Sequence, residues 1–471
     1  MRISVIGAGY VGLTTAACLA EIGHTVCCAD NDEGKLALLR KGQVPFFEPH
    51  LEEIVSRNTS AGRLRFDTTD NAVTGAKAIF ICVGTPPLEN GDADLSAVAN
   101  VARMIAQRAS GDCLVIEKST VPVQTGQQLK RQLQLSGDKT LRCDLASNPE
   151  FLREGSAIED FFHPERIVIG VERESAAEQL REIYRPLLEG TFRCPVHADC
   201  KIDKKPAWIV TDMNSAELIK HASNSFLAMK ISFINMVSDL CEAVGADVSK
   251  VALGMGMDPR IGAAFLNPGI GFGGFCFPKD VQAFVRIAEK SGCDFSLLRE
   301  VENINKRRVT HFVETVRKEL WVLRGRKIAL WGLAFKPNTD DVRFAPSLEI
   351  ARALVREGAE VRAYDPKANE KARAVLPEIQ YCSTPSDAAQ GAEAILLVTE
   401  WEEFRQVDWQ KIREVVERPL IIDGRNALDS AKVTRSGFDY VSVGRAAVAS
   451  EGAQPGSGDQ SPSLQKLTGA R

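Results

Sequence analysis

The stretch RISVIGAGYVG, residues 2–12, decides the fold, because an apolar strand pattern passes in it directly into a G-x-G-x-x-G motif. In such a motif the first two glycines let the backbone turn and approach a pyrophosphate, and the third lets the helix pack on the strand. The N-terminus of that helix then faces the phosphates. Asp30 ends the next strand pattern, close to the offset of about 20 residues at which a carboxylate accepts hydrogen bonds from the adenosine ribose. The stretch therefore predicts a dinucleotide-binding, Rossmann-like domain.

The charge of Asp30 favours NAD over NADP as the cofactor, because a 2′-phosphate would meet a carboxylate there. Lys35 could reach a phosphate or the ribose, although a solvated helix lysine explains it nearly as well. Thr85 lies in a turn that ends a later buried strand, where ligands of open α/β sheets bind, but an ordinary turn would look the same. The candidate NAD contacts in this part of the chain are Gly7, Gly9, Tyr10, Val11, Gly12, Asp30, Lys35 and Thr85.

Short runs rich in Val and Ile alternate with segments of helical period, which is typical of βαβ units and of a parallel sheet with helices on both faces. The pattern changes after Asp203, and residues 208–244 contain neither Pro nor Gly, so we expect one long helix there. The strand and helix rhythm returns at residues 327–332. The predicted fold class is α/β, with two Rossmann-like doubly wound domains joined by a long central helix.

We expect four parts: residues 1–202 as the first Rossmann-like domain, 203–320 as a central helical region, 321–445 as the second Rossmann-like domain, and 446–471 as a tail. The tail is rich in Gly, Ser, Pro and Gln and lacks an aliphatic pattern, so it is expected to be disordered.

The overall composition argues against several classes of protein. The 58 basic and 62 acidic residues are interspersed and leave a net charge of -4, so no large basic surface for nucleic acid is expected. No apolar run approaches the roughly 20 residues of a membrane helix, and no leader pattern is seen, so we expect no membrane partner and a cytoplasmic protein.

The 12 cysteines are scattered and do not suggest a disulfide framework. Cys194, His197 and Cys200 could ligate a metal, but no second cluster with zinc spacing accompanies them, so no metal site is predicted.

A second motif, GFGGFCFPKD at residues 271–280, places Cys276 after a glycine-rich loop and beside Lys279 and Asp280. Glycines let a ligand approach closely, and a nearby cation stabilises the reactive thiolate. Cys276 is therefore a candidate nucleophile, although a lone cysteine is more often a packed hydrophobe. On the predicted long helix, Lys220 and Asn224 lie one turn apart and share a face. A solvated lysine is the alternative for Lys220.

Two loops carry further polar candidates. Thr120 follows a buried strand in the segment KSTVP, residues 118–122, and Glu150 and Glu154 lie in the polar loop NPEFLREG, residues 148–155. Taken alone, either loop could be plain turn chemistry.

The motifs at residues 7–12, 118–122, 148–155, 217–220, 271–280 and 332–337 occur in the order and context of the UDP-glucose 6-dehydrogenase family, which the chain resembles over about residues 1–445. The resemblance implies NAD in the first domain, UDP-glucose between the two domains, and a homodimer built on the central helix, which makes residues 203–320 a dimerisation region and 321–445 a UDP-sugar-binding domain.

The resemblance also implies roles for individual residues. Cys276 would be the nucleophile and Lys220 its charged companion, with Asp280 and Thr120 positioning a water, Glu150 acting as acid or base, and Asn224 beside them. Thr120, Glu154, Lys279 and Arg343 would contact NAD. The implied substrate contacts are Glu150, Phe151, Leu152, Arg153, Glu154, Lys220, Asn224, Phe265, Leu266, Asn267, Pro268, Gly269, Gly273 and Lys336, with Arg260 reaching across the dimer interface.

The implied activity is an NAD-dependent, two-step, four-electron oxidation of UDP-glucose to UDP-glucuronate through a thiohemiacetal and a thioester on Cys276. GDP-mannose dehydrogenases, which carry an extra aromatic–Ala step in the cysteine loop, and UDP-N-acetylmannosamine dehydrogenases, which typically have His before the cysteine, are the alternatives among enzymes. A non-catalytic NAD-linked sensor or scaffold is the alternative outside them. One departure from the family pattern is Phe275, where a small residue is usual; its ring either fills a neighbouring gap or crowds the nicotinamide.

Overall fold

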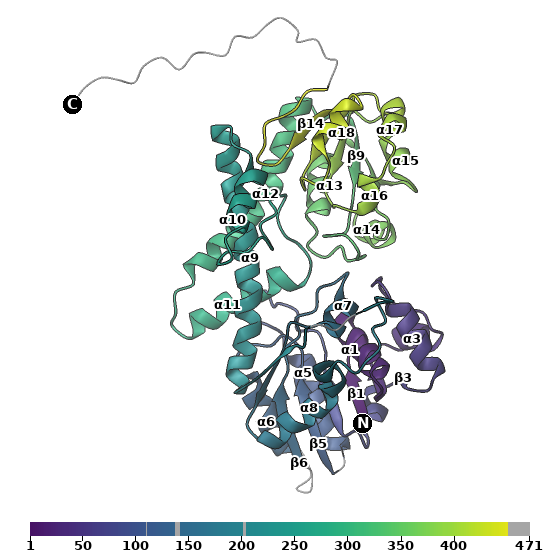
Figure 1. The fold of residues 1–471 in the computed structure, drawn as a ribbon, viewed down its shortest axis with the longest axis vertical. Helices are drawn as coiled ribbons and strands as arrows, with labels where there is room; N and C mark the ends of the chain where they lie inside the picture. Colours follow the sequence, from purple (N-terminus) through teal and green to yellow (C-terminus); the bar gives the residue numbers. More distant parts are fainter. Residues whose placement is uncertain (110, 137–141, 201–203, 451–471) are drawn as a thin grey trace, which may run out of the picture.

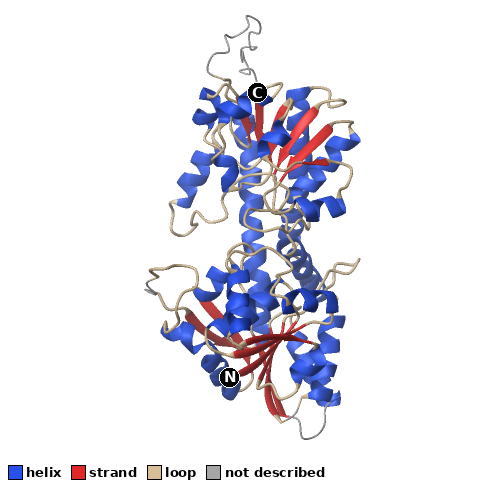
Figure 2. Cartoon of the chain, turned by 90° about the vertical axis from the view of Figure 1, so that its right-hand side faces the viewer, coloured by secondary structure: helices blue, strands red, loops and turns tan. Residues whose placement is uncertain are grey.

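Two α/β lobes lie at opposite ends of a long helix in the computed structural model, which describes residues 1–450 except 110, 137–141 and 201–203 (Figure 1). We call residues 1–211 the N-terminal lobe and residues 327–450 the C-terminal lobe. Figure 2, turned by 90°, shows that each lobe has one sheet with helices packed on both of its faces. The predicted architecture of two Rossmann-like domains joined by a central helix is confirmed.

The sheet of the N-terminal lobe has eight strands in the order β3-β2-β1-β4-β5-β6-β7-β8. Its first six strands have the 3-2-1-4-5-6 order of a dinucleotide-binding fold. β7 runs antiparallel to β6, so the expectation of a wholly parallel sheet is wrong at that one pairing. The strands are β1 Arg2–Ile6, β2 Thr25–Ala29, β3 Leu64–Asp67, β4 Ala78–Ile81, β5 Asp112–Glu117, β6 Arg142–Ser147, β7 Arg166–Val171 and β8 Ala207–Thr211.

Helices cover both faces of this sheet with separate apolar cores, one under α1, α3, α7 and α8 and one under α4, α5 and α6. The helices are α1 Tyr10–Glu21, α2 Glu33–Arg40, α3 Leu51–Ser60, α4 Thr69–Val73, α5 Ser96–Arg108, α6 Thr125–Ser136, α7 Ala157–Phe162 and α8 Glu174–Glu189. Burial on both faces explains why the strands read as nearly continuous apolar runs.

The central helix α9 spans Met213–Val244, about 48 Å at 1.5 Å per residue. The Asp212 carboxylate caps its N-terminus by accepting from the Ser215 N–H, and Gly245 ends it with φ 75°. The expected start at residue 208 is wrong, because residues 207–211 pair with β7 as strand β8. α9 packs against α11 Cys276–Lys290 and α12 Ser296–Leu320, and α10 Val248–Gly256 follows it.

The sheet of the C-terminal lobe repeats the first topology, in the order β11-β10-β9-β12-β13-β14. Its strands are β9 Lys327–Trp331, β10 Glu360–Tyr364, β11 Gln380–Tyr381, β12 Ala394–Leu397, β13 Leu420–Asp423 and β14 Asp439–Ser442. Its helices are α13 Pro346–Arg356, α14 Asn369–Val375, α15 Pro385–Ala389, α16 Glu402–Arg405, α17 Trp409–Val415 and α18 Ser430–Arg435.

The two lobes use matching residues at the ends of their first two strands. Gly7 and Gly332 follow β1 and β9 with φ of 104° and 97°, and a Cβ on either would meet a neighbouring strand end at 2.5 Å or less. Asp30 follows β2 and accepts from the Ala8 N–H at 2.8 Å. Asp365 follows β10 and accepts from the Leu333 N–H at 2.7 Å. The Trp401 indole N–H also donates to Asp365 at 3.0 Å, so this carboxylate stabilises the loops of its own lobe.

Two further expectations are addressed by the described residues. Residues 446–450 are ordered, because Val448 exchanges backbone hydrogen bonds with Tyr440 of β14 at 2.9 Å and the Ser450 N–H donates to Asp439. The expected disordered tail therefore begins too early, and its remainder, 451–471, lies outside the described residues. Within the described part of the chain, every helix is too short or too polar to cross a bilayer. The boundaries at 202 and 320 stay predictions.

Candidate active site

Cys276 begins α11 at the end of a glycine loop that is pressed between the central helices and the C-terminal lobe. Gly271 has φ 95°, and a Cβ on it would lie 2.7 Å from Asn305 Oδ1. A Cβ on Gly273 would lie 2.3 Å from the Phe344 carbonyl oxygen. Side chains at these positions would push the loop away, so glycine fixes how closely Cys276 approaches the second lobe.

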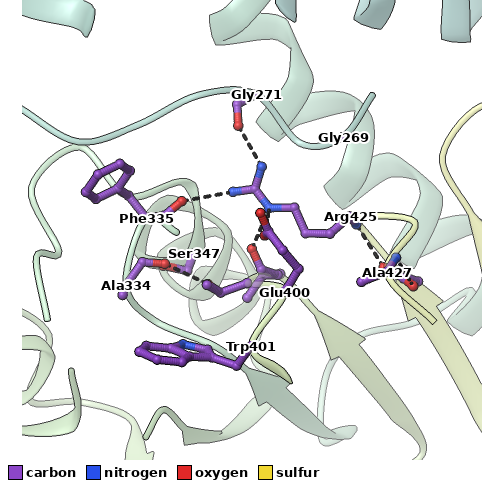
Figure 3. A network of polar contacts seen from close by, with 12 residues as sticks. Gly269, Gly271, Ala334, Phe335, Ser347, Glu400, Trp401, Arg425 and Ala427 are labelled. Carbon is purple, nitrogen blue, oxygen red and sulfur yellow. Dashed lines mark hydrogen bonds and ion pairs between the residues drawn. The ribbon is translucent and has the colours of Figure 1, made fainter. Parts of the chain in front are cut away.

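Arg425, at the end of β13, ties the glycine loop to the C-terminal lobe (Figure 3). Its guanidinium donates to the carbonyl oxygens of Gly271 at 2.9 Å and of Phe335 at 3.3 Å, and it lies 3.4 Å from the Glu400 carboxylate. On the other side, the Asn305 amide accepts from the Phe272 N–H and donates to its carbonyl. Neither residue was singled out in the sequence, because their partners are far away along the chain.

Four buried side chains form two linked ion pairs near Cys276. Lys220 of α9 donates to Glu150 at 2.9 Å, and each side chain is only 5% exposed. Asp280 of α11 accepts from Lys279 at 2.6 Å and from the Asn224 amide at 2.6 Å. The reading of Lys220 as a solvated helix residue is therefore wrong.

Electrostatics hold Lys220 as an ammonium and Cys276 as a thiol. Burial lowers the pKa of Lys220, but Glu150, Asp280 and Cys276 outweigh burial and raise that pKa above its usual value. Burial, Glu150 and Asp280 raise the pKa of Cys276 to about 12, against the opposing effect of Lys220. The lowering of the Cys276 pKa by Lys220 is smaller than the rise that burial and the carboxylates cause, and the role of Cys276 as nucleophile stays a prediction. A further positive charge or a base has to accompany loss of its proton.

Glu154 and Arg343 bring the two lobes together beside Phe275. Burial and Asp341 raise the pKa of Glu154 to about 8, against Arg343 and Lys336. The Arg343 guanidinium lies 3.6 Å from the Glu154 carboxylate and 4.5 Å from the centre of the Phe275 ring. Phe275 therefore packs under a cation next to the cysteine loop. Such stacking over an aromatic face is favourable.

The glycine motif after β1 has the features that a dinucleotide requires. A Cβ on Gly12 would lie 1.8 Å from the Gly7 carbonyl oxygen, so helix α1 begins directly at the strand end. Gly9 caps that helix without a side-chain hydrogen bond, which leaves the N–H groups of the first turn for an anion. Val11 lies in that first turn and is half-buried.

The carboxylate of Asp30 stands beside this motif as an anion. Burial raises the pKa of Asp30, but the N–H groups of Ala8 and Asp32 and the Lys35 ammonium together hold that pKa below its usual value. Lys35 itself lies 3.0 Å from Asp30. The residues present therefore fit an adenosine ribose rather than a 2′-phosphate.

The remaining predicted cofactor residues lie along the same edge of the sheet. The Thr85 hydroxyl donates to the Thr120 carbonyl oxygen at 2.8 Å, which joins the loops after β4 and β5. The Tyr10 hydroxyl bonds to Glu48, and it accepts from the Gly155 N–H at 2.9 Å. The first turn of α1 is thereby fixed to the loop that carries Glu150 and Glu154.

Several predicted substrate residues are brought together and others are not. Glu150, Phe151, Leu152 and Arg153 line one pocket, and Arg153 is held by Asp160. Lys336 and Arg343 act on Glu154 from the C-terminal lobe, and Gly273 contacts that lobe at Phe344.

Leu266 instead packs in a core with Ile234 and Val248, and Arg260 is exposed and paired with Asp258. Phe265, Asn267, Pro268 and Gly269 lie on the loop before Gly271, and the Gly269 N–H donates to Asn235 of α9.

Sequence reasoning missed three buried polar residues around the loop at 148–155. Lys118 donates to the Asn148 side chain at 3.1 Å, and burial lowers the pKa of Lys118 to about 8. Glu48 accepts from the N–H groups of Gly155 and Ala157. Lys118 and Asn148 directly follow apolar strands, which was a usable signal; Glu48 lies in an irregular loop and offered none.

Comparison with known proteins places the whole chain in one context. Residues 1–188, 214–307 and 329–430 match the NAD binding, central and UDP binding domain models of the UDP-glucose/GDP-mannose dehydrogenase family. The UDP-glucose 6-dehydrogenase YwqF of Bacillus subtilis (strain 168) is 45% identical, with 96% of this chain and 100% of the relative covered. A solved UDP-glucose dehydrogenase from Pyrobaculum islandicum is 37% identical with a TM-score of 0.83, covering 94% and 98%. A UDP-D-ManNAc dehydrogenase from Pyrococcus horikoshii is 28% identical with a TM-score of 0.80, covering 94% and 99%.

Replacing Asp30 by asparagine tests which part of its role concerns the cofactor. The amide of Asp30→Asn keeps an acceptor for the Ala8 N–H but loses the charge that would repel a 2′-phosphate. We expect the preference for NAD over NADP, measured as the ratio of kcat/KM values, to fall roughly tenfold, or about 1.4 kcal/mol. Asp365→Asn, at the matching position of the second lobe, should leave the ratio unchanged. An unaltered ratio in Asp30→Asn would show that Asp30 has only a structural role, like Asp365.

Proposed function

The chain belongs to the UDP-glucose/GDP-mannose dehydrogenase family, and on that premise we propose that it uses NAD to oxidise the C6 alcohol of UDP-glucose to the carboxylate of UDP-glucuronate. The observation that carries the substrate is the 45% identity over the full length of a UDP-glucose 6-dehydrogenase. The buried Cys276, Lys220 and Asp280 supply the groups that this oxidation needs.

Two other nucleotide sugars are weaker candidates. The chain is similar to a UDP-D-ManNAc dehydrogenase at 28% identity only, and Phe275 stands before the cysteine. The loop GFGGFC lacks the extra aromatic–Ala step expected for GDP-mannose. A non-catalytic sensor would have no use for two buried ion pairs, which are costly to desolvate.

The side chains divide the chemistry between them. Bound NAD would take up a hydride in each of the two oxidations. Between these, Cys276 Sγ forms a bond to the aldehyde carbon while its proton goes to the carbonyl oxygen, giving a thiohemiacetal. The Lys220 ammonium stabilises negative charge on that oxygen as the bond forms. The covalent link keeps the aldehyde in the site until its second oxidation yields a thioester.

Hydrolysis of the thioester returns the thiol and releases the acid. We assign positioning of the water to Asp280 and Thr120, with Glu150 as the acid or base and Asn224 orienting Asp280. Glu154, Lys279, Arg343, Thr85 and Thr120 are assigned to NAD. The loop 148–155, residues 265–269, Gly273 and Lys336 are assigned to UDP-glucose.

A homodimer through α9 is the proposed assembly. Phe226, Phe233 and Leu240 recur every seven residues, so they share one helix face, and they are 58%, 44% and 62% exposed. Such a stripe of large apolar side chains is costly to leave in water. The same interface would bring Arg260 of a partner toward the substrate. The expected cytoplasmic location stays a prediction.

Leu240→Glu tests the assembly, since a carboxylate on this face would be buried without a partner in a dimer. Multi-angle light scattering should report a dimer for the unmodified chain and a monomer for the variant. Leu297→Glu, on an exposed position of α12, should remain dimeric. A dimer that survives Leu240→Glu at micromolar concentration excludes this face.

Cys276→Ser tests the covalent route together with the substrate. With UDP-glucose the unmodified chain should release two NADH per sugar nucleotide, with kcat/KM about a hundredfold above GDP-mannose and UDP-N-acetylmannosamine. The serine variant should form acid at least about a thousandfold more slowly, because a hydroxyl is a far weaker nucleophile, while binding NAD within a few-fold by fluorescence titration. Near-normal acid production by the variant would refute the thioester route.

Lys220→Met separates catalysis by charge from simple packing. Loss of the ammonium should lower kcat about 10²–10³-fold, or roughly 3–4 kcal/mol, with a smaller change in KM. Because the variant leaves the buried Glu150 carboxylate without its ion-pair partner, it should also be less stable. Lys220→Met combined with Glu150→Gln removes that penalty and should recover stability, while its kcat should lie well below that of Glu150→Gln alone, which is the reference because Glu150 is itself assigned as acid or base.

Asn224→Ala is the matched control on the same helix face. It removes a hydrogen bond to a charged group, so it should raise the activation free energy by about 1.5–3 kcal/mol, less than Lys220→Met does. Stopped-flow NADH formation and circular dichroism together measure both effects. If the double variant matched the kcat of Glu150→Gln alone, Lys220 would be a structural residue only.

A further inference from the structure

Four potential metal ligands of the N-terminal lobe meet on segments outside the cysteine loop. Cys194, His197 and Cys200 lie in the connection between α8 and β8, and His163 ends α7. One donor atom from each of the four lies within 4.8 Å of the others. Sequence spacing alone shows only the three residues at 194–200; the fourth comes from a segment 31 residues before Cys194.

The separations between these atoms match the size of a zinc site. His163 Nε2 lies 3.2 Å from Cys194 Sγ and 3.5 Å from Cys200 Sγ. Cys194 Sγ lies 3.6 Å from His197 Nδ1. In a tetrahedral zinc site with Zn–S of about 2.3 Å and Zn–N of about 2.0–2.1 Å, sulfur and nitrogen ligands are roughly 3.5 Å apart. Three of the six ligand pairs are therefore close to the separations of a zinc site, and all six lie within 4.8 Å.

A network of thiol–imidazole hydrogen bonds explains the geometry less well. A neutral imidazole nitrogen carries either one N–H or one lone pair, directed along one line in the ring plane. His163 Nε2 faces two sulfur atoms at once, and a single N–H or lone pair cannot point at both. A metal on the lone pair would place both sulfurs beside it, as observed.

The surroundings also suit charged thiolate ligands. The backbone N–H of His197 donates to Cys194 Sγ at 3.4 Å, which stabilises negative charge on sulfur. With His197 Nδ1 turned to the cluster, its Nε2 lies 3.8 Å from the Glu159 carboxylate. Histidines that bind metals commonly offer their second ring nitrogen to a carboxylate, which fixes the ring and strengthens the ligand.

We propose that His163, Cys194, His197 and Cys200 bind a structural zinc ion. A set of two cysteines and two histidines fills a tetrahedral zinc and leaves no open position for substrate, which is the pattern of a structural site rather than a catalytic one. The proposal replaces the expectation of no metal, which considered residues 194–200 alone. It does not depend on the nucleotide-sugar chemistry.

The zinc would tie the long α8–β8 connection to the end of α7, and through α7 to the substrate loop. Asp160 of α7 holds Arg153 by its backbone N–H at 2.7 Å and by an ion pair at 2.6 Å. His163 and Asp160 also line the same pocket as Glu150 and Phe151. Loss of the metal would therefore loosen the segment from residue 153 to residue 163.

Metal analysis of the intact chain, purified without chelator and with any histidine tag removed, tests the proposal directly. Mass spectrometry of the metals should find about one zinc per chain. Cys194→Ser should lose it, whereas Cys293→Ser, an exposed cysteine outside the cluster, should keep it. A strong chelator should lower the Tm of the unmodified chain and leave that of Cys194→Ser unchanged.

Cobalt substitution keeps the test decisive if Cys194→Ser fails to fold. Stripped protein titrated with Co²⁺ should show the visible bands of a tetrahedral site and a sulfur-to-cobalt charge-transfer band, both saturating at about one ion per chain. Cys200→His retains four ligands, so it should fold and bind while its charge-transfer band falls by about half. Absence of zinc together with absence of a tetrahedral cobalt spectrum in the unmodified chain would overturn the proposal, as would bands that persist unchanged in Cys194→Ser.

Discussion

The site depends on balancing four charges in a place that water hardly reaches. Lys220, Glu150, Lys279 and Asp280 are nearly fully buried, and each would be strongly destabilising without its partner. The Lys220–Glu150 pair joins the central helix to the loop after β6. Lys279 and Asp280 are neighbours on α11, and the Asn224 amide joins Asp280 to the central helix. These contacts between segments form only when the loop after β6, α9 and the start of α11 are all in place, so the chemistry and the tertiary structure require each other.

That balance also sets the reactivity of Cys276. Burial and two nearby carboxylates raise the pKa of Cys276, while the Lys220 cation that opposes them is already paired with Glu150. Phe275, which departs from the family pattern, has its ring centre 4.5 Å from the Arg343 guanidinium and 5.7 Å from Lys279 Nζ. Its ring therefore lies within contact range of two cations beside the site.

Much of this could be predicted because the decisive signals are local. The glycine motif, the strand-end carboxylate Asp30 and the cysteine loop each lie within a few residues of sequence, and the family resemblance then supplied their roles. Five features were not predictable in this way. They are the antiparallel direction of β7, the strand at residues 207–211, and the contacts of Arg425, Glu48 and His163. Each of these depends on a partner distant in the chain, and neither periodicity nor spacing records such a partner. Cys276 is a different case: the lysine beside it was visible in the sequence, but the burial that raises the pKa of the thiol was not.

The unbroken central helix has a mechanical consequence. α9 carries Lys220 and Asn224 near one end, and Asn235, which holds Gly269, eleven residues further on. A continuous hydrogen-bonded rod transmits rotation without changing the spacing along it, and within α9 no proline or glycine offers a flexing point. The C-terminal lobe follows α12 in the chain, so a movement of one lobe relative to the other would bend the chain at Asp212, before α9, or at residues 321–326, between α12 and β9. The stiff helix would then act as a fixed axis for the two lobes, and two of the six residues assigned to catalysis, Lys220 and Asn224, lie on that axis.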